Sequence, residues 1–513
     1  MTTGDCSLAA RIRAVPRIDP GVPALEFEGR WSTWGALANA IDHVGPVVTR
    51  PGRQVGILLR NRPGLVGALL GILSAGGCVV AINPERGLER TRADVAELDV
   101  DVILGLESDV REIVGERTGT HTRIGLEGLE KEAIVRVERQ TTPPASAREG
   151  TAVRMLTSGT TGTPKRIALD YALFERVFRG AKHYESNKTA DLRLRTGVAI
   201  INAPLVHVSG IFRTLQCVFD GRSFCLLDRF RVETWLDAVR RHQPRTTSLV
   251  PAALRMVLAA DLDPKDLASL QSVVCGTAPL DPDDADAFFS RYGIPVLVSY
   301  GATEFGGGVA GWNLADHSAF WKAKRGSVGR AHPGCQLRVV SETDGVVVGH
   351  DTAGLLEVKA DPLGDDAWTR TTDLARIDED GFLWILGRAD HAIIRGGFKV
   401  LPETVQAALE RHPDVRGAVV IGRPDRRLGA VPVAAVELHT GAVAEEADLL
   451  AHLAGSLAPY EIPTEIRILE TLPRTTSGKG DLRAIAEHFD AQPASVTAVP
   501  AVLANDARDG GRT

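Results

Sequence analysis

The 513-residue sequence has no excess of basic residues, and its formal net charge is −6. A protein whose main partner is nucleic acid carries a basic face, so this balance argues against that class. The six cysteines show no Cys-x-x-Cys spacing and most stand in apolar runs. This pattern favours buried, reduced thiols over disulfides or a zinc site, and it predicts a cytoplasmic protein. The first twenty residues lack a continuous apolar core, so we expect no secretory signal peptide there.

Long apolar runs are also scarce, and only residues 65–82 resemble a membrane span in length. Gly76 and Gly77 interrupt this stretch, and β-branched residues follow them. The pattern predicts a buried helix that ends near Ser74, then a strand over residues 78–82, rather than a span.

The length is too great for one hydrophobic core, so we expect two or three domains. The composition, 44% hydrophobic and 24% charged, is typical of a globular protein. Strand and helix patterns alternate through the first 300 residues, which predicts an α/β fold with doubly wound sheets. Residues 326–360 predict a small barrel-like sheet, and the chain from residue 392 predicts a compact α+β unit.

Three local expectations complete this outline. Ser32 is the expected cap of a helix over residues 33–44. Residues 113–150 are charged and rich in turn formers, which predicts a loop. The tail over residues 491–513 lacks an amphipathic period, and we expect it to be disordered.

Residues 156–165 (LTSGTTGTPK) form the most informative stretch, directly after an apolar run. Two glycines allow a tight turn with inward N–H groups, and the hydroxyls and Lys165 can then meet phosphate oxygens. The stretch is not a Walker A loop, because Pro164 separates Gly162 from Lys165. Taken alone, such a turn is more often a solvated loop.

A second signal, Tyr300-Gly301-Ala302-Thr303-Glu304, stands at the predicted end of a strand. Ligands of doubly wound sheets bind at such carboxyl ends. A tyrosine ring can stack on a base, and a glutamate can hold Mg²⁺ through oxygen. A strand-to-loop turn with an exposed acid remains the alternative.

These stretches resemble the motifs of the adenylate-forming superfamily: acyl-CoA synthetases, amino-acid-activating domains of peptide synthetases, and firefly-type luciferases. The phosphate loop and the YGATE run are followed in the family's order by TTDL at 371–374, GRAD at 387–390 and PRTTSGK at 473–479. Two departures are small. Thr372 stands where the family more often has glycine, and the arginine expected three residues after the lysine is one position later, at Arg483.

The resemblance implies roles for particular residues. It implies a nucleotide site made by Thr157, Ser158, Gly159, Thr160, Thr161, Gly162, Lys165, Gly276, Thr277, Ala278, Pro279, Tyr300, Gly301, Asp373 and Arg388. It implies catalytic roles for Lys479, Thr303 and Glu304, with Thr161 and Glu304 on Mg²⁺. The expected acid pocket comprises His207, Gly210, Ile211, Cys275, Phe305, Gly306 and Gly307. Asp390 is the expected hinge, and Arg395, Gly396 and Gly397 the expected coenzyme A tunnel.

The resemblance further implies an ATP- and acid-binding domain over residues 1–388 and a lid domain over 389–490 that carries the catalytic lysine. The implied reaction activates a carboxylic acid with ATP and Mg²⁺ as an acyl-adenylate, then transfers the acyl group to coenzyme A. No acidic residue stands in the segment 205–212, where amino-acid-activating relatives bind the ammonium group, so the acid is not expected to be an α-amino acid. The glycines after Phe305 suggest a bulky aryl or polycyclic acid.

Several alternatives stay open. The acceptor could be an amine or a carrier protein instead of coenzyme A, although no appended carrier-protein motif is visible. A luciferase-type oxygenase and a catalytically dead nucleotide- or acyl-binding module are the other two. Whether the protein forms a homodimer also stays open.

Overall fold

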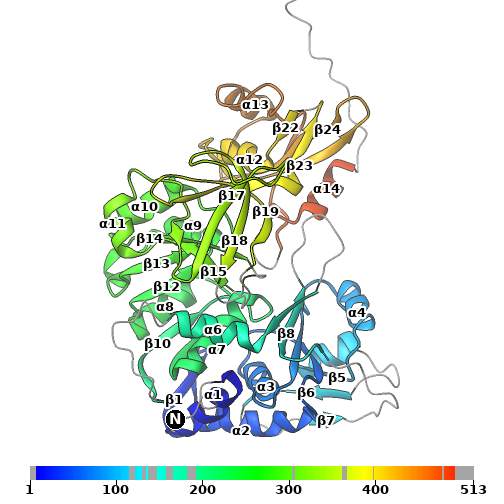
Figure 1. Ribbon diagram of the computed structural model, residues 1–513, viewed down its shortest axis with the longest axis vertical. Coiled ribbons are helices and arrows are strands. Elements are labelled where there is room, and N and C mark those ends of the chain that lie inside the picture. Colours follow the sequence, from blue (N-terminus) through cyan, green and yellow to red (C-terminus); the bar gives the residue numbers. More distant parts are fainter. Residues whose placement is uncertain are drawn as a thin grey trace, which may run out of the picture.

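A computed structural model describes residues 7–114, 122–126, 128–129, 134–136, 147–156, 166–181, 192–302, 305, 307–360, 367–396, 398–475 and 479–490. The fold is mixed α/β, with a large N-terminal part of three sheets and their helices, a small antiparallel sheet, and a C-terminal α+β unit. This fold class is the one that the sequence predicts. The C-terminal unit lies at the opposite end of the molecule from α1 (Leu8–Ala14) and α2 (Trp34–Val44) (Figure 1).

The largest sheet has seven strands in the order β7-β6-β5-β3-β4-β8-β9. They are β7 (Ile134–Arg136), β6 (Thr122–Gly125), β5 (Val102–Gly105), β3 (Gln54–Leu58), β4 (Cys78–Ile82), β8 (Thr151–Leu156) and β9 (Arg166–Asp170). The inner strands run parallel, and the edge strands β7 and β9 run antiparallel. All residues of β3 and β4 are buried, as is usual when helices cover both faces of a parallel sheet.

The apolar stretch at 65–82 folds as predicted, with α3 (Pro63–Ser74) ending at Ser74 and followed by β4. Helix α3 begins with proline at its first position and is buried from Gly64 to Ser74. It packs against α2 and α1 in the largest hydrophobic core. In the part of the chain that the structure describes, no helix has the length and apolar character needed to cross a membrane.

Two further sheets complete the N-terminal part. One has the order β10-β11-β1-β2, with β10 (Arg195–Ile201), β11 (Arg222–Leu226), β1 (Pro23–Phe27) and β2 (Arg30–Thr33). The other has the order β12-β13-β14-β15-β16, with β12 (Thr246–Leu249), β13 (Ser272–Cys275), β14 (Val296–Ala302), β15 (Gly307–Gly311) and β16 (Arg330–Ala331). The helices are α4 (Leu88–Ala96), α5 (Glu107–Asp109), α6 (Tyr171–Ala181), α7 (Val208–Asp220), α8 (Val232–His242), α9 (Pro251–Ala259), α10 (Pro282–Tyr292) and α11 (Leu314–Phe320).

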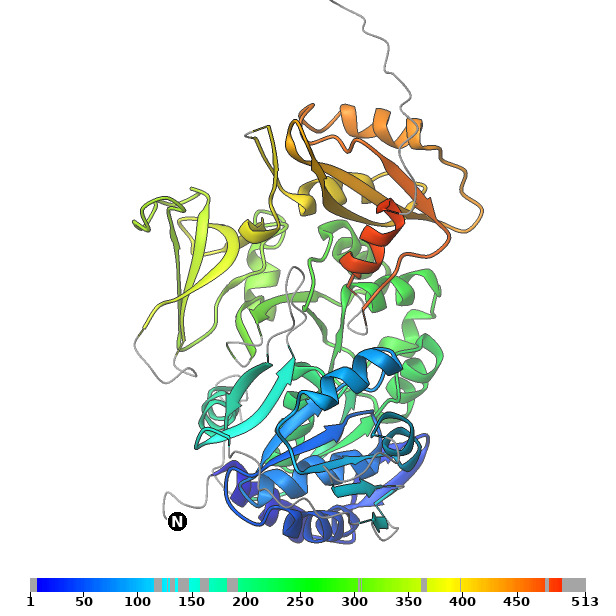
Figure 2. The same cartoon turned by 90° about the vertical axis from the view of Figure 1, so that its right-hand side faces the viewer.

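The small antiparallel sheet and the C-terminal unit follow. The small sheet contains β17 (Cys335–Val340), β18 (Gly354–Ala360), β19 (Thr369–Ile377) and β20 (Leu383–Arg388). The C-terminal unit contains β21 (Ile393–Arg395), β22 (Phe398–Val400), β23 (Val415–Asp425), β24 (Gly429–Leu438) and β25 (Ile466–Leu469), with α12 (Pro402–Glu410), α13 (Glu446–Ala454) and α14 (Leu482–Asp490). Figure 2 shows the small sheet in yellow-green beside the orange C-terminal unit.

Two local predictions were wrong. Residues 113–150, expected as a loop, contain β6 and β7, because β6 pairs in parallel with the buried strand β5 and so extends the sheet. The cap of α2 is Thr33 and not Ser32. The Thr33 hydroxyl accepts a hydrogen bond from the Ala36 amide at 3.1 Å, whereas Ser32 pairs with Leu25 in the sheet. The tail at 491–513 lies outside the described residues.

Candidate active site

Tyr300, on strand β14, contacts the small sheet. The Tyr300 hydroxyl donates a hydrogen bond to Oδ2 of Asp373 on β19. Gly301 allows this close arrangement, since a Cβ there would lie 2.2 Å from the carbonyl oxygen of Gly307 on the neighbouring strand. The pairing of β14 with β15 shifts register between Tyr300 and Gly301. At this irregularity the Tyr300 side chain of the N-terminal part contacts a carboxylate of the small sheet.

Asp373 and Arg388, both predicted to contact the ribose, lie directly opposite each other across β19 and β20. The Arg388 guanidinium also makes a two-pronged contact with Asp390, with Nε–Oδ1 at 2.9 Å and Nη2–Oδ2 at 2.7 Å. This contact is the main reason that the pKa of Asp390 lies below its usual value. Arg388 therefore links the predicted ribose site to the predicted hinge.

Two residues that sequence reasoning missed, His391 and Glu403, lie beside this set. The imidazole Nδ1 of His391 is 3.9 Å from Oε1 of Glu403, which stands in the first turn of α12. Burial, and then the Arg388 cation, lower the pKa of His391, while burial raises the pKa of Glu403. Gly387 has φ +148°, a conformation that favours glycine, and a Cβ there would lie 2.8 Å from Oε2 of Glu403. Pro402-Glu403 in the sequence signals only a helix start.

Lys479 stands on a tight hairpin of the C-terminal unit. The carbonyl oxygen of Lys479 accepts a hydrogen bond from the Thr475 amide at 2.7 Å, and Arg474 and Gly480 form a bridge below it. Gly480 packs against Val419, since a Cβ there would lie 2.6 Å from Cγ2 of that valine. These contacts position the backbone of Lys479 on the unit, and its side chain is exposed.

The charge of Lys479 reaches two histidines of the site. Burial lowers the pKa of His207 first, and the Lys479 cation lowers it further. Lys479 also contributes to the lowered pKa of His391. His207 stands at the N-cap position of α7, so the lysine of the C-terminal unit acts electrostatically on a residue of the N-terminal part. The structure brings Tyr300, Asp373 and Arg388 together, and the charge of Lys479 acts on His207 and on His391. The roles of these residues stay predictions.

The predicted adenine loop carries unusual backbone geometry. Thr277 has φ +73°, in the left-handed region that β-branched residues avoid. Gly276 must lack a Cβ, because one would lie 2.8 Å from the carbonyl oxygen of Ser299. Strain of this kind collects at ligand-binding loops. The roles of residues 276–279 stay predictions.

Several predicted acid-pocket residues are deeply buried. Ile211 and Cys275 are fully buried and Phe305 nearly so, and burial raises the pKa of the Cys275 thiol to about 12. Gly210 is fixed by packing, since a Cβ there would lie 2.2 Å from the carbonyl oxygen of Pro204. The roles of these residues in binding the acid stay predictions.

The glycines after Phe305 differ in what surrounds them. A Cβ on Gly307 would meet only Val177 Cγ1, at 4.0 Å, whereas one on Gly308 would lie 2.8 Å from Ser299 Oγ and 3.4 Å from His332 Nε2. A side chain would therefore have open space at Gly307, beside α6, whereas Ser299 and His332 fill the space at Gly308. The part of Gly307 in an acid pocket stays a prediction.

The residues predicted for the coenzyme A tunnel lie on the hairpin of β21 and β22. Arg395 donates hydrogen bonds to the carbonyl oxygens of Tyr460 and Ile462, both at 2.9 Å, so its guanidinium is held within the C-terminal unit. Gly396 has φ +58°, a conformation that favours glycine. Phe398 stacks on Tyr460 with ring centroids 4.7 Å apart.

Part of the predicted site lies outside the described residues. These are Thr157, Ser158, Gly159, Thr160, Thr161, Gly162 and Lys165 of the phosphate loop, together with Thr303, Glu304, Gly306 and Gly397. The flanks of the phosphate loop are described, and Leu156 pairs with Arg166 across β8 and β9. The predicted roles of all these residues stay predictions.

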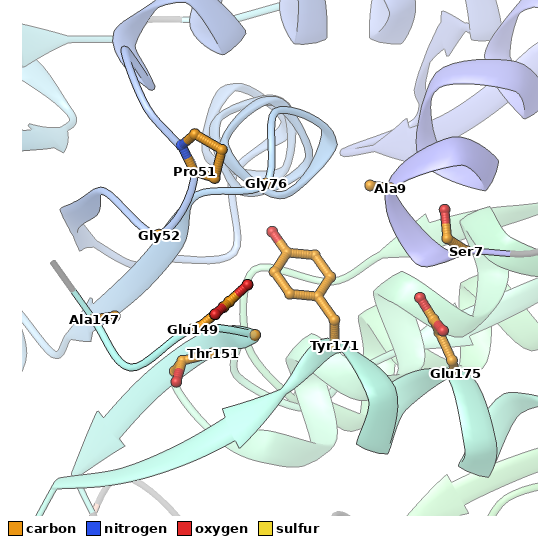
Figure 3. Close-up of a pocket in the computed structure, with 11 residues that line it drawn as sticks. Ser7, Ala9, Pro51, Gly52, Gly76, Ala147, Glu149, Thr151, Tyr171 and Glu175 are labelled. Carbon is orange, nitrogen blue, oxygen red and sulfur yellow. The ribbon is translucent and has the colours of Figure 1, made fainter. Parts of the chain in front are cut away.

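A cavity of about 550 Å³ lies elsewhere (Figure 3). Its lining includes Gly52, Gly76 and Thr151, at the amino ends of β3, β4 and β8, and Tyr171, whose hydroxyl donates to the Gly77 carbonyl oxygen at 2.7 Å. The phosphate loop follows the carboxyl end of β8. This cavity is therefore separate from the candidate site.

The structure is that of an α/β protein in two parts. The N-terminal part carries Tyr300 on β14, and the C-terminal unit carries Lys479. The chain belongs to the AMP-binding enzyme family, whose sequence model matches residues 12–362, and the model of that family's C-terminal domain matches residues 404–479. The resemblance seen in the sequence is confirmed.

Relatives of known name cover almost the whole chain. The chain is 28% identical to indoleacetate–CoA ligase of Aromatoleum aromaticum, over 90% of this chain and 94% of that one. It is 29% identical to 2-succinylbenzoate–CoA ligase of Bacillus velezensis, with the same coverage.

Among solved structures, ATP-bound MatB from Rhodopseudomonas palustris matches with a TM-score of 0.78 at 24% identity, over 94% of this chain and 99% of that one. The apo structure of MatB matches over the same shares with a TM-score of 0.65. Both matches show that this chain shares the fold of MatB.

Proposed function

We propose that the protein is an AMP-forming acid–CoA ligase. The carboxylate of an organic acid attacks the α-phosphorus of ATP, the bond to the β-phosphate oxygen breaks, and pyrophosphate leaves. The thiol of coenzyme A then attacks the acyl carbon of the acyl-adenylate, and AMP leaves. The observation that carries this proposal is the convergence of Tyr300, Asp373 and Arg388 with Lys479, which comes from the other part of the chain.

Asp373 and Arg388 would hold the nucleoside. An ionised carboxylate only accepts hydrogen bonds and has about four acceptor sites, so Asp373 can accept from ribose hydroxyls while it accepts from Tyr300. Arg388 offers five N–H donors, of which Asp390 takes two. A ribose bound over the Asp373 and Arg388 side chains would therefore find both an acceptor and a donor.

Lys479 would stabilise negative charge in the first step. The attack brings an acid carboxylate and a phosphate together, and a fixed cation where charge accumulates lowers the barrier. His207, neutral because its pKa is lowered, adds no competing positive charge there. No general base is needed, since a carboxylic acid is already ionised near neutral pH.

The second step would need a different orientation of the C-terminal unit. A rotation about Asp390 withdraws Lys479 and brings the β21–β22 hairpin to the site, where the thiol of coenzyme A enters. The domain limits 1–388 and 389–490 belong to this proposal. The sequence models of the family support them by matching on either side of residue 390.

We further propose that the acid is an aryl acid. Two of the relatives are named for indoleacetate and 2-succinylbenzoate, both aromatic acids. The open side of Gly307, opposite Val177, supports a flat ring at this wall. Mg²⁺ would neutralise phosphate charge when bound, and Thr161 and Glu304, its predicted ligands, lie outside the described residues. A cytoplasmic location accords with the described cysteines, none of which forms a disulfide.

A two-stage assay tests this function. Purified protein is incubated with ATP, Mg²⁺ and single acids, among them indoleacetate, 2-succinylbenzoate, acetate and butyrate, and pyrophosphate release is measured. Acids that react are then offered coenzyme A, an amine or a carrier protein. Acyl-CoA formation from an aryl acid supports the proposal. Amide formation or carrier loading alone would assign another acceptor, turnover of acetate and butyrate alone would reject the aryl preference, and no pyrophosphate with any acid would indicate a non-catalytic module.

A further inference from the structure

Besides Arg388–Asp390 at the predicted hinge, two ion pairs among the described residues join the C-terminal unit to the N-terminal part. The first joins Arg255 on α9 to Glu410, the last residue of α12, with Nη2 and Oε2 3.3 Å apart. Each of the two side chains also has contacts within its own part. Arg255 also contacts Asp284 at 2.6 Å, and Oε1 of Glu410 accepts from Gln406 and from the Ala418 amide. Each side chain is fixed on its own part, so the distance between Arg255 and Glu410 depends on how the two parts are oriented.

The second pair acts on the hairpin itself. Lys399 on β22 contacts Glu342, in the turn between β17 and β18, with Nζ and Oε2 2.5 Å apart. In this position the hairpin exposes Ile394 and Phe398, each more than half exposed. The contact therefore holds the hairpin against the small sheet while its apolar side chains face solvent.

Both pairs are present in the orientation in which the charge of Lys479 reaches His207. Arg255 and Glu342 belong to the N-terminal part, and Glu410 and Lys399 move with the C-terminal unit. A rotation about Asp390 that swings the hairpin into the site has to separate both pairs.

We infer that Arg255–Glu410 and Lys399–Glu342 form a clamp that holds the C-terminal unit in the orientation for adenylation, so that these four positioning residues set the balance between the two half-reactions. This inference rests on the proposed function.

The two pairs differ in strength. The Glu410 side chain is 14% exposed, whereas that of Glu342 is 45% exposed. Water and salt screen an exposed pair more than a shielded one. The Arg255–Glu410 pair is therefore the stronger half of the clamp, and the Lys399–Glu342 pair is the half that salt weakens first.

The test separates the half-reactions in Glu410→Gln, Glu342→Gln and the double variant. ATP–pyrophosphate exchange measures adenylation, and single-turnover thioester formation from preformed acyl-adenylate measures the second step. The ratio of thioester formation to adenylation should rise in each single variant, and by about three- to tenfold in the double variant. The matched control is Asp351→Asn, which removes an ion pair with Arg376 inside the N-terminal part. Its ratio should equal that of the wild type.

A charge-reversal variant and a measurement that does not depend on activity complete the design. The variant Lys399→Glu with Glu342→Lys restores the pair in reverse, so it should return the ratio to the wild-type value. Hydrogen exchange of the amides in α9 and α12 should quicken in the double variant and stay unchanged in Asp351→Asn.

Equal ratios and equal amide exchange in the double variant and the control would overturn the clamp. If the wild type catalyses no pyrophosphate exchange with any acid, the proposed function fails, and amide exchange alone then decides whether the pairs hold the orientation.

Discussion

The hydrogen bond between Tyr300 and Asp373 gives the sharpest test of the nucleotide site. Tyr300→Phe keeps the aromatic ring for stacking but removes the hydroxyl that donates to Asp373 Oδ2. A hydrogen bond to a charged group contributes about 1.5–3 kcal/mol. Both side chains are partly exposed, so water replaces some of the loss and the lower limit applies. A loss of about 1.5 kcal/mol weakens binding about tenfold.

The assay measures pyrophosphate release as a function of ATP concentration. The KM for ATP should rise about tenfold in Tyr300→Phe while kcat changes little, because the bond positions the ribose contact and is not made only in the transition state. The control is Tyr292→Phe, which removes a hydroxyl that donates to the Val257 carbonyl oxygen at 3.3 Å, remote from the site. An unchanged KM in Tyr300→Phe, or an equal rise in both variants, would refute the assignment of Asp373 to the nucleotide.

Three further predictions concern charge and space. Lys479→Ala should slow adenylation by about a hundredfold or more, and by removing a cation it should raise the pKa of His207, which NMR titration measures without any substrate; an unchanged pKa would contradict the placement of Lys479. Burial lowers the pKa of His332, so the unfolded chain binds more protons below its ordinary pKa of about 6.5. Thermal stability should therefore fall as pH drops below that value, and less steeply in His332→Gln; parallel curves would show that His332 is not responsible. Gly307→Leu fills the space opposite Val177, so aryl acids should lose turnover relative to acetate in a competition assay, and an unchanged preference would place the acid elsewhere.

The limits of helices and strands were predicted well where glycines mark them in the sequence. Gly76-Gly77 marked the end of α3 near Ser74 and the limits of β4 at residues 78–82. The polar stretch around β6 gave no such signal, because its strand character comes from pairing with β5 and not from its own residues. The cap of α2 was placed one residue early, because Ser32 and Thr33 have equivalent side-chain chemistry and only the backbone distinguishes them.

The candidate site was predicted from motifs, so residues outside these motifs were missed. Asp373 and Arg388 were both singled out, but their position opposite each other follows from the register of β19 and β20. His391 and Glu403 were missed because neither belongs to a spacing pattern, and their altered pKa values arise from burial between elements distant in the chain. The ion pairs between the two parts could not be predicted for the same reason.

The double engagement of Arg388 has a thermodynamic consequence. The same guanidinium grips Asp390 in the linker and stands opposite Asp373. A ligand that draws on its donors changes the grip on the linker, and linkage then requires that bending the linker change the affinity for that ligand by the same factor. In the proposed function, release of AMP and return of the C-terminal unit would therefore be coupled equilibria, and the Arg388 side chain would carry part of the coupling energy.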